Sequence, residues 1–414
     1  MGIPRLAEIE QRLYSRRVRS IPGAVVRAWE RAGIGRSIRR GDRVGITVGS
    51  RGIDNIAAIT RSVADLVEQA GGRPFVIPAM GSHGGATAAG QTALLKSLGV
   101  TPASVGAPIR ASMAAVKVGG TSHGAAVYAS QEALKADGLI VMNRIKQHTD
   151  FVGEYESGLV KMLAVGLGKR KGAMAMHSRS CASLREDIPE AAGILLKRLR
   201  VVGGVAILEN GCHQTADIVG VRQEEILPRE RALLRRARRT AARIPFREVD
   251  LLIVDWIGKD ISGVGFDTHV IGRRMIWGEP EFRGPRIGVV AALDVTPGSR
   301  GNALGLGLAD LVTARLVRKI DWGAIKTNVL HTGFLNRAKV PITLRNDREL
   351  VGAAITALGD PDRRRVRVVR ITDTLSLGRM WVSEGLLPEA RRHPRVRVVG
   401  MPAEMKFDRS GNLK

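Results

Sequence analysis

The sequence contains few cysteines, and it has no long apolar run. Only Cys181 and Cys212 occur among 414 residues, and their spacing fits neither a CxxC motif nor a disulfide framework. No stretch of about 18 consecutive apolar residues is present, which excludes a transmembrane helix by the usual length criterion. The first residues include no apolar run of signal-peptide length. We therefore expect a cytoplasmic protein with no role in a membrane.

Acidic and aromatic residues are also scarce. The chain has 65 Lys and Arg against 39 Asp and Glu, which gives a formal charge of +26. Such a charge can indicate nucleic-acid binding, because Lys and Arg neutralise phosphates. However, the basic residues are spread along the chain, aromatics make up 4%, and no zinc-finger spacing or heptad pattern occurs. We expect nucleic acid not to be the main partner, and a non-catalytic basic binding protein remains an alternative.

The chain does have a regular alternation of short apolar runs and helical patterns. This alternation is typical of β-α units and a mainly parallel sheet. We predict strands over residues 42–48, 74–78, 138–142, 201–208, 249–254, 287–293, 365–371 and 395–399, and helices over 55–69, 223–242 and 302–319. We expect two α/β domains, residues 1–245 and 246–414, with mainly parallel sheets and an interdomain cleft. Ligand-binding loops should follow the carboxyl ends of the strands.

Two of the eight histidines follow predicted strands. His83 lies in the glycine-rich loop 81–86, and His148 lies in the loop after strand 138–142. A histidine flanked by glycines is open to a ligand, because no neighbouring side chain covers it. These positions favour a functional role, although His83 can also be a turn residue before the next helix.

Lys161 stands in a largely apolar segment, residues 159–167. Such a lysine either extends its amine to the surface or is positioned for covalent or ionic chemistry. His177 follows it, and several glycines between them let the chain fold back. Because imidazole binds Zn, Cu, Fe and Ni, a metal-dependent hydrolase or another α/β enzyme using His83, His148 and His177 is an alternative.

Together these residues resemble the lactate racemase family, whose enzymes use a nickel-pincer nucleotide. The resemblance extends to about residue 180 and depends on several anchors in one order, not on a single motif. The anchors are Arg51 after the first predicted strand, His83, His148, Ser157 with Gly158, Lys161 and His177.

The resemblance implies an isomerase that racemises or epimerises a 2-hydroxy acid by hydride transfer to the nickel-pincer nucleotide. It implies that residues 1–245 form the cofactor-binding and catalytic domain, and that residues 246–414 close the cleft. The expected partners are a small 2-hydroxy acid, with a sugar acid as an alternative, and the proteins that synthesise the cofactor.

The resemblance also implies roles for individual residues. The family's two acid–base histidines correspond to His83 and His148, and its nickel ligand corresponds to His177. The implied cofactor-binding residues are Lys161, as the covalent attachment point, together with Ser157, Gly158 and Arg51.

Overall fold

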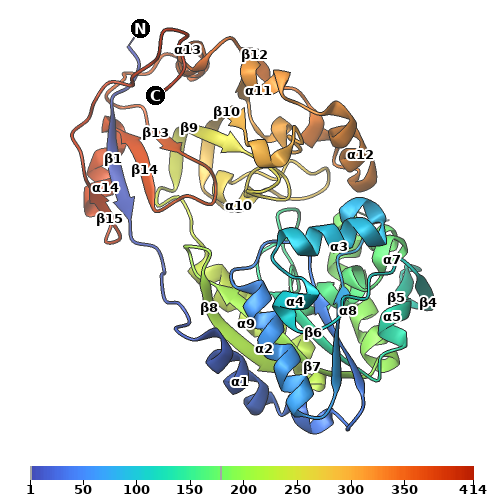
Figure 1. Cartoon of the computed structure of the whole chain (residues 1–414). Helices are drawn as coiled ribbons and strands as arrows, with labels where there is room; N and C mark the ends of the chain where they lie inside the picture. Colours follow the sequence, from blue (N-terminus) through green and yellow to red (C-terminus); the bar gives the residue numbers. More distant parts are fainter. Residues whose placement is uncertain (1, 178–179) are drawn as a thin grey trace. The chain divides into compact units, whose positions relative to one another are not determined.

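The chain forms two compact units in the computed structural model, which describes residues 2–177 and 180–414 (Figure 1). One unit spans Ser15–Ala241, and the other, called here the split unit, combines Met1–Tyr14 with Ala242–Lys414. The sequence assigned residues 1–14 to the first domain. They join the split unit because β1 (Leu6–Gln11) pairs with strands β14 and β15 near the other end of the chain.

A five-stranded sheet forms the centre of the Ser15–Ala241 unit, in the order β3-β2-β6-β7-β8. Its strands are β2 (Arg43–Val48), β3 (Arg73–Pro78), β6 (Gly138–Arg144), β7 (Val201–Glu209) and β8 (Thr215–Val221). The pairs β2–β3, β2–β6 and β6–β7 are parallel, and β7–β8 is antiparallel. The chain runs from β2 outward to β3 and later returns to β6 on the other side of β2. This reversal places a typical ligand-binding position at the carboxyl end of β2.

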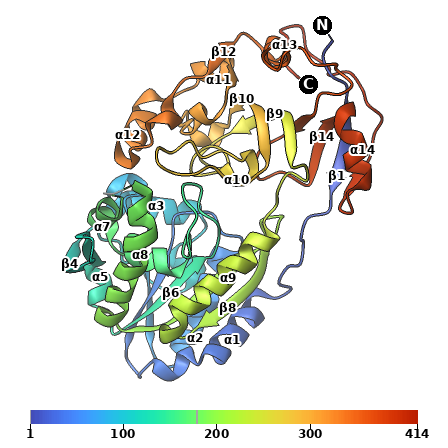
Figure 2. The ribbon, with the colours of Figure 1, turned by 180° about the vertical axis from the view of Figure 1, so that it is seen from behind.

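Helices lie on both faces of this sheet (Figures 1 and 2). Helices α1 (Ile21–Ala32) and α2 (Ile56–Gln69) share one core with Ile46 and Ile140 of the sheet. Helices α8 (Ser180–Arg198) and α9 (Ile226–Thr240) lie on the opposite face. Since both faces are covered, β2 and β6 are buried over most of their length.

The remaining elements of this unit are short. They are η1 (Ile34–Ser37), η2 (Gly84–Ala86), α3 (Ala88–Ser97), α4 (Pro102–Val105), the hairpin β4 (Ala115–Gly120) and β5 (Ala126–Ser130), α5 (Gln131–Leu134), α6 (Leu159–Lys161), the π-helix η3 (Met162–Gly166), α7 (Lys169–Met176) and η4 (Gln223–Glu225).

The split unit contains an eight-stranded sheet in the order β12-β11-β10-β9-β13-β14-β1-β15. Besides β1, its strands are β9 (Glu248–Ile257), β10 (Arg286–Val295), β11 (Leu311–Thr313), β12 (Ile342–Leu344), β13 (Val368–Ile371), β14 (Arg379–Ser383) and β15 (Val396–Val398). Strands β12 to β13 in this order are parallel, and β14, β1 and β15 add antiparallel pairs. Its helices are α10 (Thr268–Ile271), η5 (Pro297–Ser299), η6 (Leu306–Leu308), α11 (Ala314–Arg318), α12 (Trp322–Thr332), η7 (Leu335–Ala338), α13 (Asp347–Ala357), η8 (Glu384–Leu386) and α14 (Leu387–Arg392).

The prediction of one helix over residues 302–319 is wrong. That range contains η6, β11 and α11. Gly305 adopts φ +94°, and a Cβ there would lie 1.8 Å from the carbonyl oxygen of Val264, so the chain turns in close contact with another loop. The buried run of β11 then pairs with β10, and the Thr313 side chain accepts a hydrogen bond from the Leu316 N–H to begin α11.

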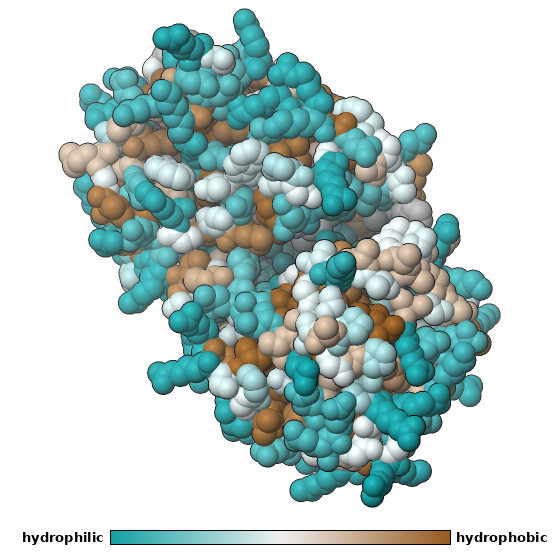
Figure 3. All heavy atoms as spheres, viewed as in Figure 1, coloured by the Kyte–Doolittle hydropathy of each residue, from teal (hydrophilic) through white to brown (hydrophobic). Residues whose placement is uncertain are grey.

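The fold class predicted from the sequence, α/β with mainly parallel sheets, is confirmed. Among the described helices, none has the length and apolar character needed to cross a membrane. On the face of the molecule shown in Figure 3, hydrophilic side chains predominate and apolar ones are scattered between them.

Candidate active site

Three neighbouring parallel strands end at one edge of the sheet in the Ser15–Ala241 unit. Strand β2 ends at Val48 and leads to Arg51, β3 leads to His83, and β6 leads to His148. Because β3, β2 and β6 are adjacent and parallel, their following loops emerge side by side. The strand order therefore brings three of the residues singled out in the sequence to the same edge.

The exposed imidazole of His83 is in contact with the loop that follows β2. Its Nδ1 atom forms a hydrogen bond with the hydroxyl of Ser50, the residue just before Arg51. The turn after His83 requires glycine at Gly84, which has φ +66° and whose Cβ would lie 2.6 Å from the backbone carbon of Gly90. Ser50 therefore orients His83, a role that no sequence motif indicates.

A buried lysine and a buried glutamine hold the His83 loop from the interior of the unit. Gln91 of α3 donates hydrogen bonds to the carbonyl oxygens of Gly81 (3.0 Å) and His83 (3.4 Å). Lys169, fully buried at the start of α7, donates to the Gln91 side-chain oxygen (3.2 Å) and to the carbonyl of Pro78. Burial lowers the pKa of Lys169 to about 8, opposed in part by the charge of Glu132. The loop is thus fixed by polar groups removed from water.

His148 and Lys161 are in direct contact, the side-chain nitrogen Nζ of the lysine meeting Nε2 of the imidazole. On the other side of the ring, Nδ1 accepts a hydrogen bond from the Asp150 backbone N–H (3.1 Å). In a neutral imidazole the single proton then resides on Nε2, facing the amine, as assigned from this hydrogen-bond pattern. A proton donated from Nε2 needs an acceptor, so the arrangement favours a neutral amine on Lys161.

The electrostatics of Lys161 agree with a neutral amine. Burial lowers the pKa of Lys161 to about 8; the charge of Asp150 opposes this shift, Arg51 adds to it, and Glu156 opposes it. Arg51, itself exposed, is therefore an electrostatic neighbour of Lys161. A lysine with such a pKa has a substantial neutral fraction near pH 8 and can act as a nucleophile.

The segment between His148 and Lys161 is shaped by the buried carboxylate of Glu156. Its Oε2 accepts a hydrogen bond from the His148 backbone N–H (2.7 Å). Its Oε1 accepts from the Gly153 N–H (3.1 Å) and from the guanidinium of Arg238 on α9 (2.5 Å). The sequence alone does not point to Glu156, because it is one of several acidic residues in a polar loop.

Ser157 and Gly158, which the resemblance assigned to the cofactor, have close backbone partners. The backbone of Ser157 forms a bridge with that of Lys146, and the carbonyl of Gly158 accepts a hydrogen bond from the Asn143 side chain (2.9 Å). Gly158 is buried, with the carboxylate of Glu230 packed directly over it. The structure thus gives both residues a part in fixing the start of α6.

His177 lies at the C-terminal end of α7, after the helical run that begins at Leu159 in α6 and continues through η3. The run is interrupted at Lys169, whose φ of +55° redirects the chain. A Cβ on Gly81 would lie 3.3 Å from that of Ala173, so α7 packs beside the His83 loop. The described contacts join His148 to Lys161 directly and place His177 on this adjacent helix, just before residues 178–179, which lie outside the described part.

A different group of side chains meets the distance expected of a metal site. Among the described residues, ligand atoms of His123, Asp187 and Glu190 lie within 4.8 Å of one another. The two carboxylates also accept hydrogen bonds from Thr121 and Ser122 in the turn between β4 and β5. These bonds tie the hairpin to α8, which is sufficient reason for the acidic groups to converge there.

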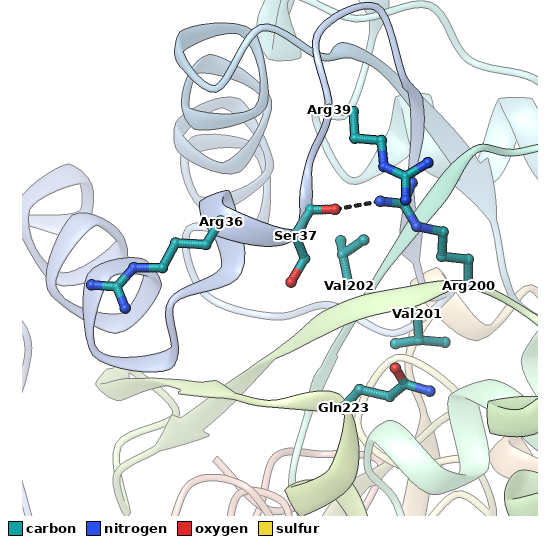
Figure 4. Close-up of a pocket in the computed structure, with 7 residues that line it drawn as sticks. All are labelled: Arg36, Ser37, Arg39, Arg200, Val201, Val202 and Gln223. Carbon is teal, nitrogen blue, oxygen red and sulfur yellow. Dashed lines mark hydrogen bonds between the residues drawn. The ribbon is translucent and has the colours of Figure 1, made fainter.

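A cavity of about 350 Å³ lies at the opposite end of the sheet, beside the first residues of β7 (Figure 4). Its lining residues are Arg36, Ser37, Arg39, Arg200, Val201, Val202 and Gln223. The guanidinium of Arg200 already donates to the carbonyl of Ser37 (2.6 Å) and to the carboxylate of Asp42 (2.7 Å). This cavity is separate from the carboxyl edge that carries the histidines.

Comparison with known proteins places the fold near that of a known enzyme. Residues 49–223 match a family model described as a domain of unknown function, DUF362. The chain is similar to the lactate racemase apoprotein from Thermoanaerobacterium thermosaccharolyticum, with 12% identity and a TM-score of 0.53, over 89% of this chain and 94% of that one. A structural-genomics protein from Thermotoga maritima shares 10% identity with a TM-score of 0.46, over 68% of this chain and 72% of that one. No curated protein matches.

The lowered pKa of Lys161 can be measured directly. Competitive acetylation across a pH series, read by mass spectrometry, should give Lys161 a midpoint at about 8. Lys96, exposed on α3, serves as the internal reference for acetylation in the same samples. A midpoint for Lys161 equal to that of Lys96 would contradict the desolvated, neutral amine.

Proposed function

We propose that this chain is an isomerase that racemises or epimerises a 2-hydroxy acid with the help of a nickel-pincer nucleotide. The observation that carries the proposal is the Lys161–His148 contact at the sheet edge that also bears His83. The similarity in fold to a lactate racemase apoprotein supports it.

The residues present fit the proposed cofactor. Covalent attachment needs a nucleophilic amine, and the pKa of about 8 gives Lys161 that property. The imidazole of His177 is a suitable nickel ligand by its chemistry. Arg51 offers a planar, bidentate donor for a carboxylate or a phosphate, and its charge already acts on Lys161.

The reaction explains why such a site needs more than histidines. The α-hydrogen of a 2-hydroxy acid is a very weak acid, because the adjacent carboxylate is negative, and a base with a pKa near ~6.5 removes it only over a high barrier. The nucleotide, when bound, supplies a hydride acceptor. The protein's own histidines then have to move only the hydroxyl proton.

In this proposal His148 exchanges the hydroxyl proton through Nε2. With a free amine, Nε2 is occupied by its contact with Lys161. A lysine nitrogen joined to a thioamide is a poor acceptor, so attachment would free the imidazole for the substrate. For Nε2 to accept the hydroxyl proton, the ring proton has to move to Nδ1, 3.8 Å from the Asp150 carboxylate, and that carboxylate then stabilises the imidazolium that forms.

His83 performs the same task from the neighbouring loop, oriented by Ser50. Inversion at a carbon needs a proton acceptor for each enantiomer, and the two histidines come from loops after β3 and β6, on either side of the loop after β2. Arg51 lies in that middle loop, where its guanidinium binds the substrate carboxylate in this proposal.

The attachment role of Lys161 is tested by replacement. When the chain is produced together with cofactor-synthesis proteins, Lys161→Ala should lose the covalent mass addition and all racemisation, and Lys161→Arg should fail equally because guanidinium forms no thioamide. Intact-mass spectrometry and an activity assay provide the readout. The exposed Lys171→Ala is the matched control. Racemisation at the wild-type rate by Lys161→Ala would exclude the attachment role.

The nickel-binding role of His177 makes a separate prediction. His177→Ala should retain the mass addition on Lys161 but lose most of its nickel, measured by elemental analysis. His123→Ala, which alters the other cluster of potential ligands, should leave nickel content unchanged. If His123→Ala loses nickel while His177→Ala keeps it, the nickel site lies at the β4–β5 turn and not at His177.

The paired bases predict a symmetric loss of rate. His83→Ala and His148→Ala should each slow interconversion in both directions by about 10²- to 10⁴-fold, since each inversion uses both histidines. The equilibrium ratio of the enantiomers stays the same, because a catalyst alters barriers only. Initial rates measured from each pure enantiomer decide the point. A variant with wild-type rates in both directions would remove that histidine from the mechanism.

A further inference from the structure

A buried carboxylate from α9 meets the backbone that carries Lys161. Glu230 is 1% exposed, and its Oε2 accepts a hydrogen bond from the Val160 N–H at 2.9 Å, with the Leu159 N–H as a further favourable contact. The first N–H groups of a helix have no partner within the helix. Glu230 therefore provides a hydrogen-bond acceptor for the backbone N–H of Val160, in the turn that leads directly to Lys161.

The packing around Gly158 shows how close this contact is. A Cβ at Gly158 would lie only 2.2 Å from Oε1 of Glu230, so any larger residue would push the carboxylate away. The carbonyl of Gly158 is held at the same time by the side chain of Asn143 in β6. The start of α6 is thus clamped between α9 and the sheet.

The placement of Glu230 is costly for folding. Burial raises the pKa of Glu230 to about 7, against the favourable backbone hydrogen bonds from Val160 and Leu159. Within the described chain, its Oε1 is buried without a hydrogen-bond partner. A carboxylate in such surroundings contributes little to stability, and its visible effect is on the position of the backbone beside Lys161.

Helix α9 also supports the segment that carries His148, the partner of Lys161. Arg238, two turns further along α9, donates to Glu156, and Glu156 accepts the backbone N–H of His148. One rigid element thus supports the segment that carries His148 and the turn that carries Lys161. A shift of α6 relative to α9 would separate the amine from the imidazole.

We propose that Glu230 is a positioning residue that holds the amine of Lys161 against His148 through the backbone of Val160. It touches neither reacting group itself and acts through the hydrogen bond to the turn before Lys161. The proposal deepens the function proposed above, since Lys161 is the attachment point there, but the contact can be tested on the chain without cofactor.

The test replaces Glu230 by an apolar residue of similar length and measures the pH midpoint for acetylation of the Lys161 amine. In Glu230→Met the acceptor is lost while the volume is filled, and replacing a buried charge in this way is often neutral or stabilising. Lys161 should gain access to water, and its acetylation midpoint should rise from about 8 toward the ordinary value near ~10.4, about two pH units. The charges that act on Lys161 are those of Asp150, Arg51 and Glu156, so such a shift reports geometry.

Two further variants distinguish the hydrogen bond from general damage. Glu230→Gln keeps an acceptor for the Val160 N–H and should retain the midpoint near 8. Glu225→Met makes the same chemical change at an exposed position just before α9 and should also retain it. Circular dichroism and thermal melting establish that each variant is folded.

A folded Glu230→Met protein with an unshifted midpoint would overturn the proposal, as would a shift in Glu230→Gln equal to that in Glu230→Met. Neither result depends on racemisation. A chain that gains no mass on Lys161 with cofactor-synthesis proteins, yet shows the expected midpoints, would disprove the proposed function and leave this inference standing.

Discussion

The contact between the Lys161 amine and the His148 imidazole is the interaction on which the site depends. Two cationic groups at this separation would repel each other, so the contact persists only while at least one of them is neutral. Burial lowers the pKa of Lys161 to about 8 and so favours the neutral amine above that pH, and the Asp150 backbone N–H fixes the ring proton of His148 on the side of the amine. The geometry of the pair and its protonation state therefore depend on each other.

The order of the strands determines which loops lie beside the Lys161–His148 pair. Because β2 lies between β3 and β6, the loop with Ser50 and Arg51 emerges between those with His83 and His148. Arg51 thus belongs to the middle one of three adjacent loops, and the outer two carry the histidines. The chain reverses direction at β2, and such a reversal is where open α/β sheets typically bind ligands.

The sequence was sufficient for the parts of the molecule that repeat a simple pattern. Strands buried on both faces are continuous apolar runs, so β2, β3, β6 and β7 were predictable, and with them the loops of Arg51, His83 and His148. The prediction of one helix over residues 302–319 failed because several leucines there follow a helical spacing while the glycines allow turns. The place of residues 1–14 was not predictable, since β1 pairs with strands more than 360 residues away.

The supporting residues of the site could not have been found in the same way. Glu230 lies in a helix rich in charged residues, where it resembles the exposed Arg229 and the half-buried Arg231 in sequence but not in burial. Lys169 stands in a basic run, and its burial depends on the partners Pro78 and Gln91 from a distant part of the chain. Only the tertiary structure separates such residues from a solvated surface.

Lys161 and these two supporting residues share one physical property. Burial is the largest cause of the lowered pKa values of Lys161 and Lys169 and of the raised pKa of Glu230, so in each case the protein disfavours the charged form. An apolar side chain would fill each space at lower cost to folding. All three lie on the segment from Leu159 to Met176 or hold it in place. These buried titratable groups gather where two loops and one lysine meet, which is a distribution typical of sites that carry out chemistry.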